Sequence, residues 1–384
     1  MEAGHVNLDM PCPIFLGPVV WRGRSDGRAC PQTRKRCALI KEFHLFAGIG
    51  GGIYGGELLG NTCCAGVEIM PYARQVLLQR QKDGWMPRFP ILPDVTKLAG
   101  EAESGVGYTD LDGKKHKIEF DVLCGGFPCQ AFSTAAHGKN IASKNLWDFM
   151  FEFVKASKAP VVFGENVVLR AIEKARHDLE SVGYKVERVR LGCEDLGADH
   201  RRNRFWLLAV RDDKNGAATF GRLAKHILSL PKLTGDCWTQ SPEKTGEAVD
   251  VPTCDRRDQL LGIGNAQSPF VAASAFRVLV NRHLNHIDER KEIVSSEELG
   301  KVFEPKKTWI TKEYREKGII TGLVHTPTTM ANYACKSMMK HEGCRNFTKV
   351  FKRPEPLNGE WLMGFPLGAS SPHPLKMTNL ERWR

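Results

Sequence analysis

Short apolar runs alternate with helical patterns between residues 42 and 211 of this 384-residue chain. The runs predicted to be strands are residues 43–47, 63–68, 121–123, 161–163 and 205–210. Helices are predicted for a segment that ends at Gly60 and for residues 73–80, 146–157 and 171–182. Alternation of this kind is typical of a mostly parallel sheet that helices cover on both faces. We therefore predict one α/β domain for residues 42–211.

The remaining segments carry weaker patterns. Residues 1–41 combine Pro, Gly and many Arg without a continuous apolar stretch, which predicts an irregular basic arm rather than a signal peptide. After Val210 the alternation is lost, and residues 212–258 mix Gly, Pro, Thr and Asp. Residues 281–356 hold 15 Lys and Arg against 10 Asp and Glu, interleaved with aromatic residues. Such a mixture suits a nucleic-acid surface, and a solvated charged face would look similar.

Composition narrows the class of protein. The net charge of +11 suits a polyanionic partner, although a basic solvated surface accounts for it equally well. The 12 cysteines lack the CxxC pairs of a zinc module, which favours a reduced intracellular protein over a disulfide framework. No apolar run approaches the ~20 residues that cross a bilayer. The composition therefore argues against disulfide-stapled and membrane-spanning classes.

A glycine-rich turn and two acidic residues suggest a site for an adenosine-containing cofactor. Residues 46–52, FAGIGGG, follow a predicted strand and open a helix, so a ligand can approach the backbone closely. Glu68 closes the second strand, where a carboxylate can bind ribose hydroxyls. Asp94 follows another short apolar run and could accept a hydrogen bond from an adenine amino group. Each acid taken alone could equally be a plain loop residue.

The segment 121–133, DVLCGGFPCQAFS, places Cys129 on a turn after an apolar strand. The carboxyl edge of a parallel sheet is where open α/β folds bind ligands. Cys129 is therefore a candidate nucleophile, but cysteines are also common as buried apolar residues. Cys124, within the strand, is expected to be structural.

Five motifs in register resemble the DNA cytosine-5 methyltransferase family. They are FAGIGG (46–51), GFPCQ with Ser133 (126–133), ENV (165–167), RNR (202–204) and LGIGNA (261–266). The similarity covers residues 43–210 nearly continuously. It implies an α/β, Rossmann-like S-adenosylmethionine-dependent methyltransferase fold with a smaller, irregular target-recognition domain. It also implies methyl transfer to carbon 5 of cytosine in a specific short duplex DNA sequence, with the base flipped out of the helix.

The resemblance also implies catalytic roles. Carbon 5 of cytosine is too weak a nucleophile to take a methyl group until a thiolate adds to carbon 6, and Cys129 corresponds to that thiolate. Glu165 corresponds to the glutamate that hydrogen-bonds ring nitrogen 3 and the exocyclic amine. Arg202 is expected at the target base and Arg204 as its support. From the residues alone, Glu165 could be a surface glutamate and the arginines an exposed basic loop. The family usually has glutamine at His200, whose role is left open.

The cofactor residues implied by the resemblance come from several segments. They are Phe46, Gly48, Gly50, Glu68, Ile69, Asp94, Leu146 and Asn265. The expected cofactor is S-adenosyl-L-methionine, and no metal is expected. His44 stands where an acidic residue is common in the family.

The order of motifs departs from the family. The Gly264-Asn265 motif precedes the segment 357–366, LNGEWLMGFP, which lies almost at the C-terminus. We therefore divide the chain into an arm (1–41), a catalytic domain (42–211), a linker or reduced recognition region (212–258), a returning catalytic segment (259–281) and a target-recognition and C-terminal region (282–384). The charge balance favours 282–356 over 212–258 as the part that reads DNA, in a layout resembling compact bacterial or phage enzymes.

Rival functions and partners follow from the same residues. An RNA cytosine-5 methyltransferase would keep the chemistry, and a catalytically idle DNA-binding relative would keep the fold. The expected partner is double-stranded DNA, for a monomer in the cytoplasm of a bacterial or phage-infected cell. The sequence leaves open the target site and whether a cognate restriction endonuclease exists.

Overall fold

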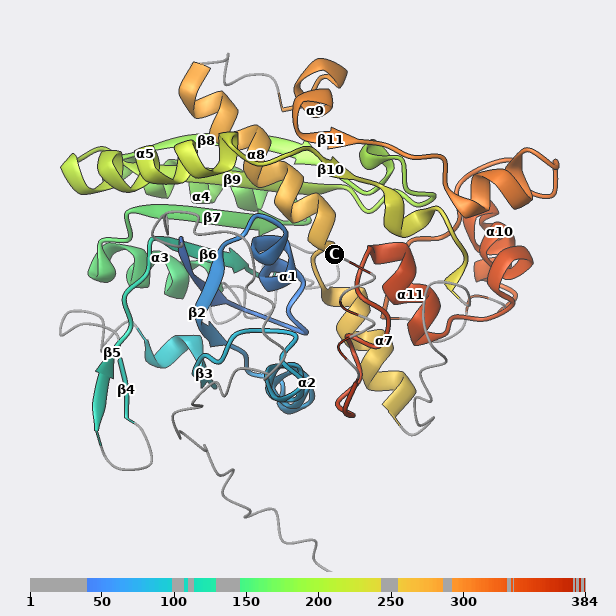
Figure 1. The fold of residues 1–384 in the computed structure, drawn as a ribbon, viewed down its shortest axis with the longest axis horizontal. Helices are drawn as coiled ribbons and strands as arrows, with labels where there is room; N and C mark the ends of the chain where they lie inside the picture. Colours follow the sequence, from blue (N-terminus) through green and yellow to red (C-terminus); the bar gives the residue numbers. More distant parts are fainter. Residues whose placement is uncertain are drawn as a thin grey trace, which may run out of the picture.

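A seven-stranded sheet forms the centre of the computed structural model, which describes residues 40–98, 107–109, 114–128, 146–242, 255–285, 292–329, 333, 335–375, 377, 380 and 383. The strand order is β3-β2-β1-β6-β7-β9-β8 (Figure 1). The strands are β1 Lys41–Leu45, β2 Thr62–Val67, β3 Ile91–Leu92, β6 Val122–Gly126, β7 Val161–Asn166, β8 Tyr184–Leu191 and β9 Arg204–Arg211. All neighbouring pairs are parallel except those made by β9, which runs antiparallel to β7 and β8. The prediction of a mostly parallel α/β sheet is confirmed.

Apolar residues alternate between the two faces of the central strands. On β6, Val122 and Cys124 belong to one hydrophobic cluster, whereas Leu123 between them belongs to the other. On β9, Trp206 and Leu208 face the first cluster. Successive side chains of a strand point to opposite faces, so these continuous apolar runs describe a sheet that is buried on both sides.

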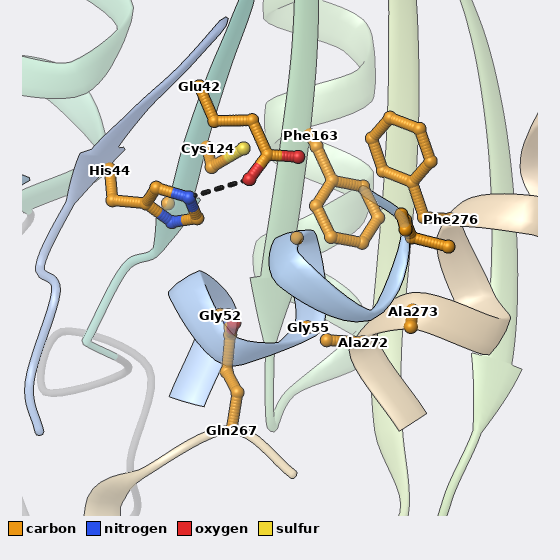
Figure 2. A pocket seen from close by; sticks show the side chains of 13 residues that line it. Glu42, His44, Gly52, Gly55, Cys124, Phe163, Gln267, Ala272, Ala273 and Phe276 are labelled. Carbon is orange, nitrogen blue, oxygen red and sulfur yellow. Dashed lines mark hydrogen bonds and ion pairs between the residues drawn. The ribbon is translucent and has the colours of Figure 1, made fainter. Parts of the chain in front are cut away.

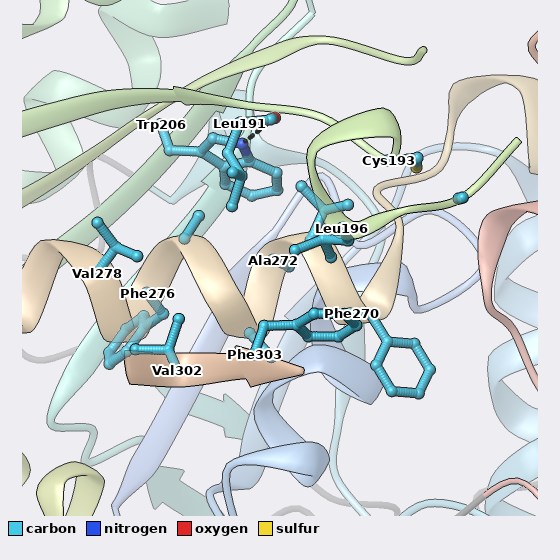
Figure 3. Close-up of a cluster of buried hydrophobic side chains, with 14 of the residues drawn as sticks. Leu191, Cys193, Leu196, Trp206, Phe270, Ala272, Phe276, Val278, Val302 and Phe303 are labelled. Atoms are coloured by element: carbon cyan, nitrogen blue, oxygen red, sulfur yellow. Dashed lines mark hydrogen bonds between the residues drawn. The ribbon is translucent and has the colours of Figure 1, made fainter. Parts of the chain in front are cut away.

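The first face is covered by α8 Pro269–Asn285, with α1 Gly51–Leu58 and α5 Lys214–Leu228 beside it. Nearly the whole of α8 is buried, because its sequence is apolar around most of its circumference. Figure 3 shows Phe270 and Phe276 of this helix among side chains of the sheet and of the segment at Phe303.

The second face is covered by α3 Leu146–Ser157 and α4 Leu169–Ser181. Both helices bury residues at helical spacing, such as Met150 and Phe153 of α3. The helix α2 Pro71–Lys82 packs in a third cluster with the first half of α1 and with residues near the C-terminus. Both α3 and α4 agree with the helices predicted from sequence, to within two residues.

One strand and one helix of the domain, β8 and α5, were not predicted from the sequence. Strand β8 carries charged residues between its apolar ones, as an edge strand partly open to water does. Helix α5 follows Val210, where the alternation was expected to be lost, and it packs on β9 and α8. Its small residues, including Gly216 and Gly221, weaken the helical signal. The helical layer on the first face thus continues into the range 212–258.

Short elements complete the described chain. They are η1 Val95–Lys97, a hairpin of β4 Gly107–Thr109 and β5 Lys115–Lys117, η5 Glu194–Leu196, β10 Leu233–Thr234, η6 Asp236–Trp238 and α7 Arg256–Asn265. Then follow α9 Ser296–Val302, β11 Phe303–Glu304, the π-helical turn η8 Thr311–Arg315, η9 Met338–Lys340, α10 Glu342–Phe351 and α11 Pro356–Met363. No helix within these described ranges is long and apolar enough to span a membrane.

The segment that contains α11 and the residues after it packs against α2. The buried Glu360 of α11 accepts hydrogen bonds from the backbone N–H groups of Gly368 and Ser370. From α2, Tyr72 donates to the carbonyl of Ser370 and Arg80 donates to that of Gly368. The segment that carries the Gly-Phe-Pro motif is therefore fastened to α2, far from it in sequence.

Candidate functional site

The predicted site residues gather at one edge of the sheet. The parallel strands β1, β2, β6 and β7 all end at this edge, because parallel neighbours share their direction. They lead into Phe46, Glu68, Phe127 and Glu165 respectively. Strand β9 is antiparallel and therefore begins here, at Arg204. The sheet itself brings together residues separated by more than a hundred positions.

The glycine-rich turn is pinned to the end of β2. The N–H of Ala47 donates to the carbonyl of Val67 at 2.9 Å, and the N–H of Gly48 donates to Oε2 of Glu68 at 2.6 Å. Gly48 has a φ of +54°, and apart from its chain neighbours no atom of the described residues lies within 4 Å of the position a Cβ would occupy. Phe46 also lies in the left-handed region, with a φ of +55°. Glycine at position 48 thus adopts the positive φ without strain, and the absence of a side chain leaves one side of the turn open.

The residues beside this turn fit an adenosine-type cofactor. The second carboxylate oxygen of Glu68 accepts from the N–H of Met70 at 2.7 Å, which fixes the side chain below the turn. The next residue, Ile69, is 68 % exposed, so its apolar side chain is accessible beside the turn. The N–H of Glu68 donates to the carbonyl of Leu92, so β3 and the following Asp94 lie alongside. A polar turn, an anion and an apolar surface are thus adjacent.

Asp94 is held at the start of η1. Its Oδ1 atom accepts from the backbone N–H of Thr96 at 2.9 Å and from the hydroxyl of the same residue at 2.8 Å. These hydrogen bonds lower the pKa of the Asp94 carboxyl. Both contacts use one oxygen, which leaves the other able to accept from an amino group.

The other predicted cofactor residues are placed as follows. Gly50 has a φ of +93° and precedes α1 directly, so the turn spans Phe46 to Gly50 and the helix begins at Gly51. Leu146 is the first residue of α3 and is half-buried. Asn265 is the last residue of α7, and its side chain is exposed.

Glu165 is the carboxylate at the centre of the predicted catalytic group. Its Oε1 atom lies 3.0 Å from Nε of Arg204, and its Oε2 atom accepts from the amide of Gln267 at 3.3 Å. The side chain is buried, with 7 % of the residue exposed. Asn166, next in the chain, donates to the carbonyl of Phe127 at 2.8 Å. This bond joins the end of β7 to the segment that leads through Pro128 to Cys129, which lies outside the described residues.

The Arg202 guanidinium binds backbone carbonyls in the structure. It donates to the carbonyls of Pro327 at 2.9 Å, Gly264 at 2.9 Å and Ala266 at 2.6 Å. The residue is only 5 % exposed, and burial lowers the pKa of its guanidinium. Of the two arginines, Arg204 rather than Arg202 contacts Glu165. Arg202 lies before β9 with a φ of +44°, whereas Arg204 is the first residue of that strand, and the sequence did not show this difference.

His200 is completely buried and links the arginine segment to α11. Its Nε2 atom hydrogen-bonds the carbonyl of Leu362 at 2.7 Å. Burial lowers the pKa of the imidazole from 6.5 to about 3, so the ring is neutral at ordinary pH. His200, whose role the sequence left open, thus anchors the segment that contains α11.

A buried polar network lies beneath α1. Figure 2 shows Glu42 and His44 of β1 facing Cys124 of β6, with a dashed contact between the first two. The carboxylate of Glu42 contacts Nε2 of His44 at 2.9 Å and accepts from the amide of Asn61 at 2.6 Å. Glu42, His44 and Cys124 place possible metal-ligand atoms within 4.8 Å, but both carboxylate oxygens already have partners.

Gln267 is the functional candidate that the sequence reasoning missed. It lies between α7 and α8, two residues after Asn265, and its side chain reaches Glu165. Its only signal was its place just beyond the Gly-Asn motif. Nothing in the spacing indicated that its amide would turn towards the sheet edge.

The mostly parallel seven-stranded sheet, with a glycine turn after β1 and an acid after β2, is a Rossmann-like methyltransferase fold. The family model of the C-5 cytosine-specific DNA methylases matches residues 40–326, and the chain belongs to this family.

Individual relatives match a shorter part of the chain. The type II methyltransferase M.MspI of Moraxella sp. is 30% identical over 185 residues, covering 44% of this chain and 38% of that protein. The type II methyltransferase M.HhaI of Haemophilus parahaemolyticus is 27% identical over 190 residues, covering 47% of this chain and 52% of that protein. The chain thus matches about half or less of these relatives' lengths. A solved structure of a prophage-encoded DNA modification methyltransferase from E. coli is 21% identical, with a TM-score of 0.33 over 45% of this chain and 47% of that one.

Proposed function

We propose that this chain transfers a methyl group from S-adenosylmethionine to carbon 5 of cytosine in duplex DNA. The observation that carries the proposal is the Glu165 carboxylate, held by Arg204 and Gln267 at the same sheet edge as the open glycine turn. The segment before Cys129 is tied to the strand that ends in this carboxylate. The acidic group and the cofactor turn thus share one edge, and Cys129 follows Phe127 by two residues in the sequence.

The proposed reaction starts with the thiolate of Cys129. Its sulfur forms a bond to carbon 6 of the extruded cytosine, and the electron pair of the 5,6 double bond moves so that carbon 5 becomes nucleophilic. Negative charge that develops at ring nitrogen 3 is relieved by a proton shared with Glu165. S-adenosylmethionine, when bound, supplies the electrophilic methyl group. Loss of the carbon 5 proton to a base then returns the electron pair and expels the Cys129 thiolate.

The chain's own residues would prepare these steps. Arg204 keeps the Glu165 side chain in one orientation, and its charge stabilises the anion that forms when the carboxyl gives up its proton. Glu68, Ile69 and Asp94 would bind the ribose and adenine parts of the cofactor. Arg202 would act as a brace between the arginine segment and the Gly-Asn turn.

We place the DNA-reading region in residues 282–356, of which the structure describes 282–285, 292–329, 333 and 335–356. Asp199, just before the arginine segment, accepts from the hydroxyl of Thr311 at 3.1 Å and pairs with Arg315 at 3.3 Å. The N–H of Val324 donates to the carbonyl of the same aspartate. Residues 308–324 are therefore held beside the proposed active site. The described part of 212–258 instead contributes α5, a helix that packs on the central sheet. This supports the layout in which the C-terminal region, rather than 212–258, reads DNA.

Bisulfite sequencing of genomic DNA from cells that express the chain tests activity, base and sequence context together. The Cys129→Ser variant should abolish methylation and the trapping of DNA that contains 5-fluorocytosine, while the purified variant keeps the wild-type melting temperature. Retention of both activities in that variant would falsify the covalent mechanism. Methylation of transfer RNA but not of duplex DNA would favour the RNA alternative, and absence of radiolabelled methyl transfer to either substrate would favour the idle relative.

A further inference from the structure

Gln267 contacts the Glu165 carboxylate from the side opposite to Arg204. Its Nε2 atom donates to Oε2 at 3.3 Å, whereas Arg204 lies 3.0 Å from Oε1. Oε2 therefore has a hydrogen-bond donor, and Oε1 has an ion-pair partner. A carboxylate held at both oxygens has little freedom to rotate, which a group that must meet one edge of a base requires.

Three glycines leave the space that this one residue fills. A Cβ at Gly126 would lie 2.7 Å from Nε2 of Gln267 and 2.8 Å from Oε2 of Glu165. A Cβ at Gly52 would lie 2.7 Å from Oε1 of Gln267, as the side chain's approach to α1 in Figure 2 illustrates. A Cβ at Gly51 would lie 2.2 Å from the backbone oxygen of Gln267. The backbone of this residue thus abuts the start of α1, while its amide extends to the carboxylate.

A role in packing alone would explain only part of these contacts of Gln267. Filling the space below α1 needs volume, and an apolar side chain would supply it without burying an amide. The amide is oriented with its donor towards Glu165 and its oxygen towards α1. The amide thus presents its N–H donor, rather than its oxygen, to the carboxylate of Glu165.

We propose that Gln267, packed against the start of α1, is a positioning residue that fixes the orientation of Glu165. The inference rests on the proposed function, since Glu165 matters only if cytosine is the substrate. It adds a residue that acts through the carboxylate without touching the base.

The test uses a reaction that needs no cofactor. Addition of the Cys129 thiolate to carbon 6 lets carbon 5 take a proton from water, and loss of the original hydrogen with expulsion of the thiolate restores cytosine. Release of tritium from duplex DNA labelled at carbon 5 therefore reports thiolate addition and Glu165 alone. Affinity for S-adenosylhomocysteine, measured by calorimetry, reports the glycine turn separately.

The Gln267→Met variant keeps the length of the side chain and removes the donor. We expect tritium release to fall about tenfold to a hundredfold, as for loss of a hydrogen bond to a charged group. Affinity for S-adenosylhomocysteine and the melting temperature should stay close to wild type. Gln259→Met is the matched control, because Gln259 is a completely buried glutamine on the neighbouring α7. It should leave tritium release unchanged.

A double-mutant cycle separates positioning from packing. In a Glu165→Gln background, Gln267→Met should lower the residual tritium release by less than twofold, because its effect passes through the missing carboxylate. Equal fold losses in both backgrounds, or wild-type tritium release by Gln267→Met alone, would overturn the inference. If the wild-type chain neither releases tritium nor methylates DNA, the proposed function fails as well, which is a distinguishable result.

Discussion

The Nε atom of Arg204 lies 3.0 Å from Oε1 of Glu165, and this contact joins the first residue of β9 to the end of β7. The antiparallel direction of β9 is what allows it, since a parallel strand would reach this edge with its last residue rather than its first. The neighbouring Arg202 instead directs its guanidinium to three backbone carbonyls. Two arginines of one motif therefore serve separate purposes.

Replacing each arginine with methionine should separate catalysis from stability. Arg202→Met leaves buried carbonyls without donors and should lower the free energy of unfolding by about 2–4 kcal/mol. Arg204→Met should cost less stability but reduce methyl transfer by roughly a hundredfold or more. Urea unfolding and single-turnover kinetics measure the two effects. Arg201→Met is the control, because the Arg201 side chain is 75% exposed, and it should change neither quantity. Equal stability losses for Arg202 and Arg204 would contradict this division.

The exposed Ile69 gives a direct test of the cofactor site. Ile69→Ser removes an apolar side chain that is already 68% exposed, so the melting temperature should stay unchanged. If an adenine ring covers this side chain, affinity for S-adenosylhomocysteine should fall about tenfold, from the lost burial of apolar area. Isothermal titration calorimetry measures the change. Ile293→Ser is matched in exposure, at 66%, and should bind as wild type does. An unchanged affinity in the Ile69 variant would place the cofactor elsewhere.

The sheet was largely predictable, since its buried strands are continuous apolar runs. The misses have physical causes. β8 is an edge strand whose charges interrupt its apolar residues, and α5 contains glycines that lower its helical propensity. The identity of the Glu165 partner depends on strand direction, which spacing does not encode. Gln267 was missed because its contact spans 102 residues of sequence.

Because His200 is buried in its neutral form, we expect the free energy of unfolding to decrease as the pH is lowered. The folded-state pKa is depressed to about 3, below the 6.5 of a free imidazole. The stability is therefore fully present above pH 6.5, where both states are neutral. Below it the unfolded chain takes up a proton that the folded chain refuses, at a cost approaching about 1.4 kcal/mol per pH unit. The loss continues as pH falls towards 3.

His200→Gln offers the carbonyl of Leu362 an amide donor without a titrating group. Its free energy of unfolding should decline less steeply between pH 6.5 and 5 than that of wild type, as measured by urea titration at each pH. His226→Gln is the control, because His226 is half-buried and also hydrogen-bonds a carbonyl, that of Leu59. Parallel pH curves for wild type and His200→Gln would show that the imidazole titrates normally.

The assignment of DNA reading to residues 282–356 predicts where charge removal weakens binding. Lys336 and Lys340 are exposed beside α10, and Lys225 and Lys232 are exposed in and after α5. Each lysine that contacts a phosphate releases counterions, so its loss lowers the slope of log affinity against log salt by about one. The Lys336→Gln, Lys340→Gln double variant should therefore bind duplex DNA more weakly, with a slope reduced by up to about two. The Lys225→Gln, Lys232→Gln variant removes the same charge from the other region. Fluorescence anisotropy over a salt series measures both, and a larger loss in the second variant would move the DNA surface to 212–258.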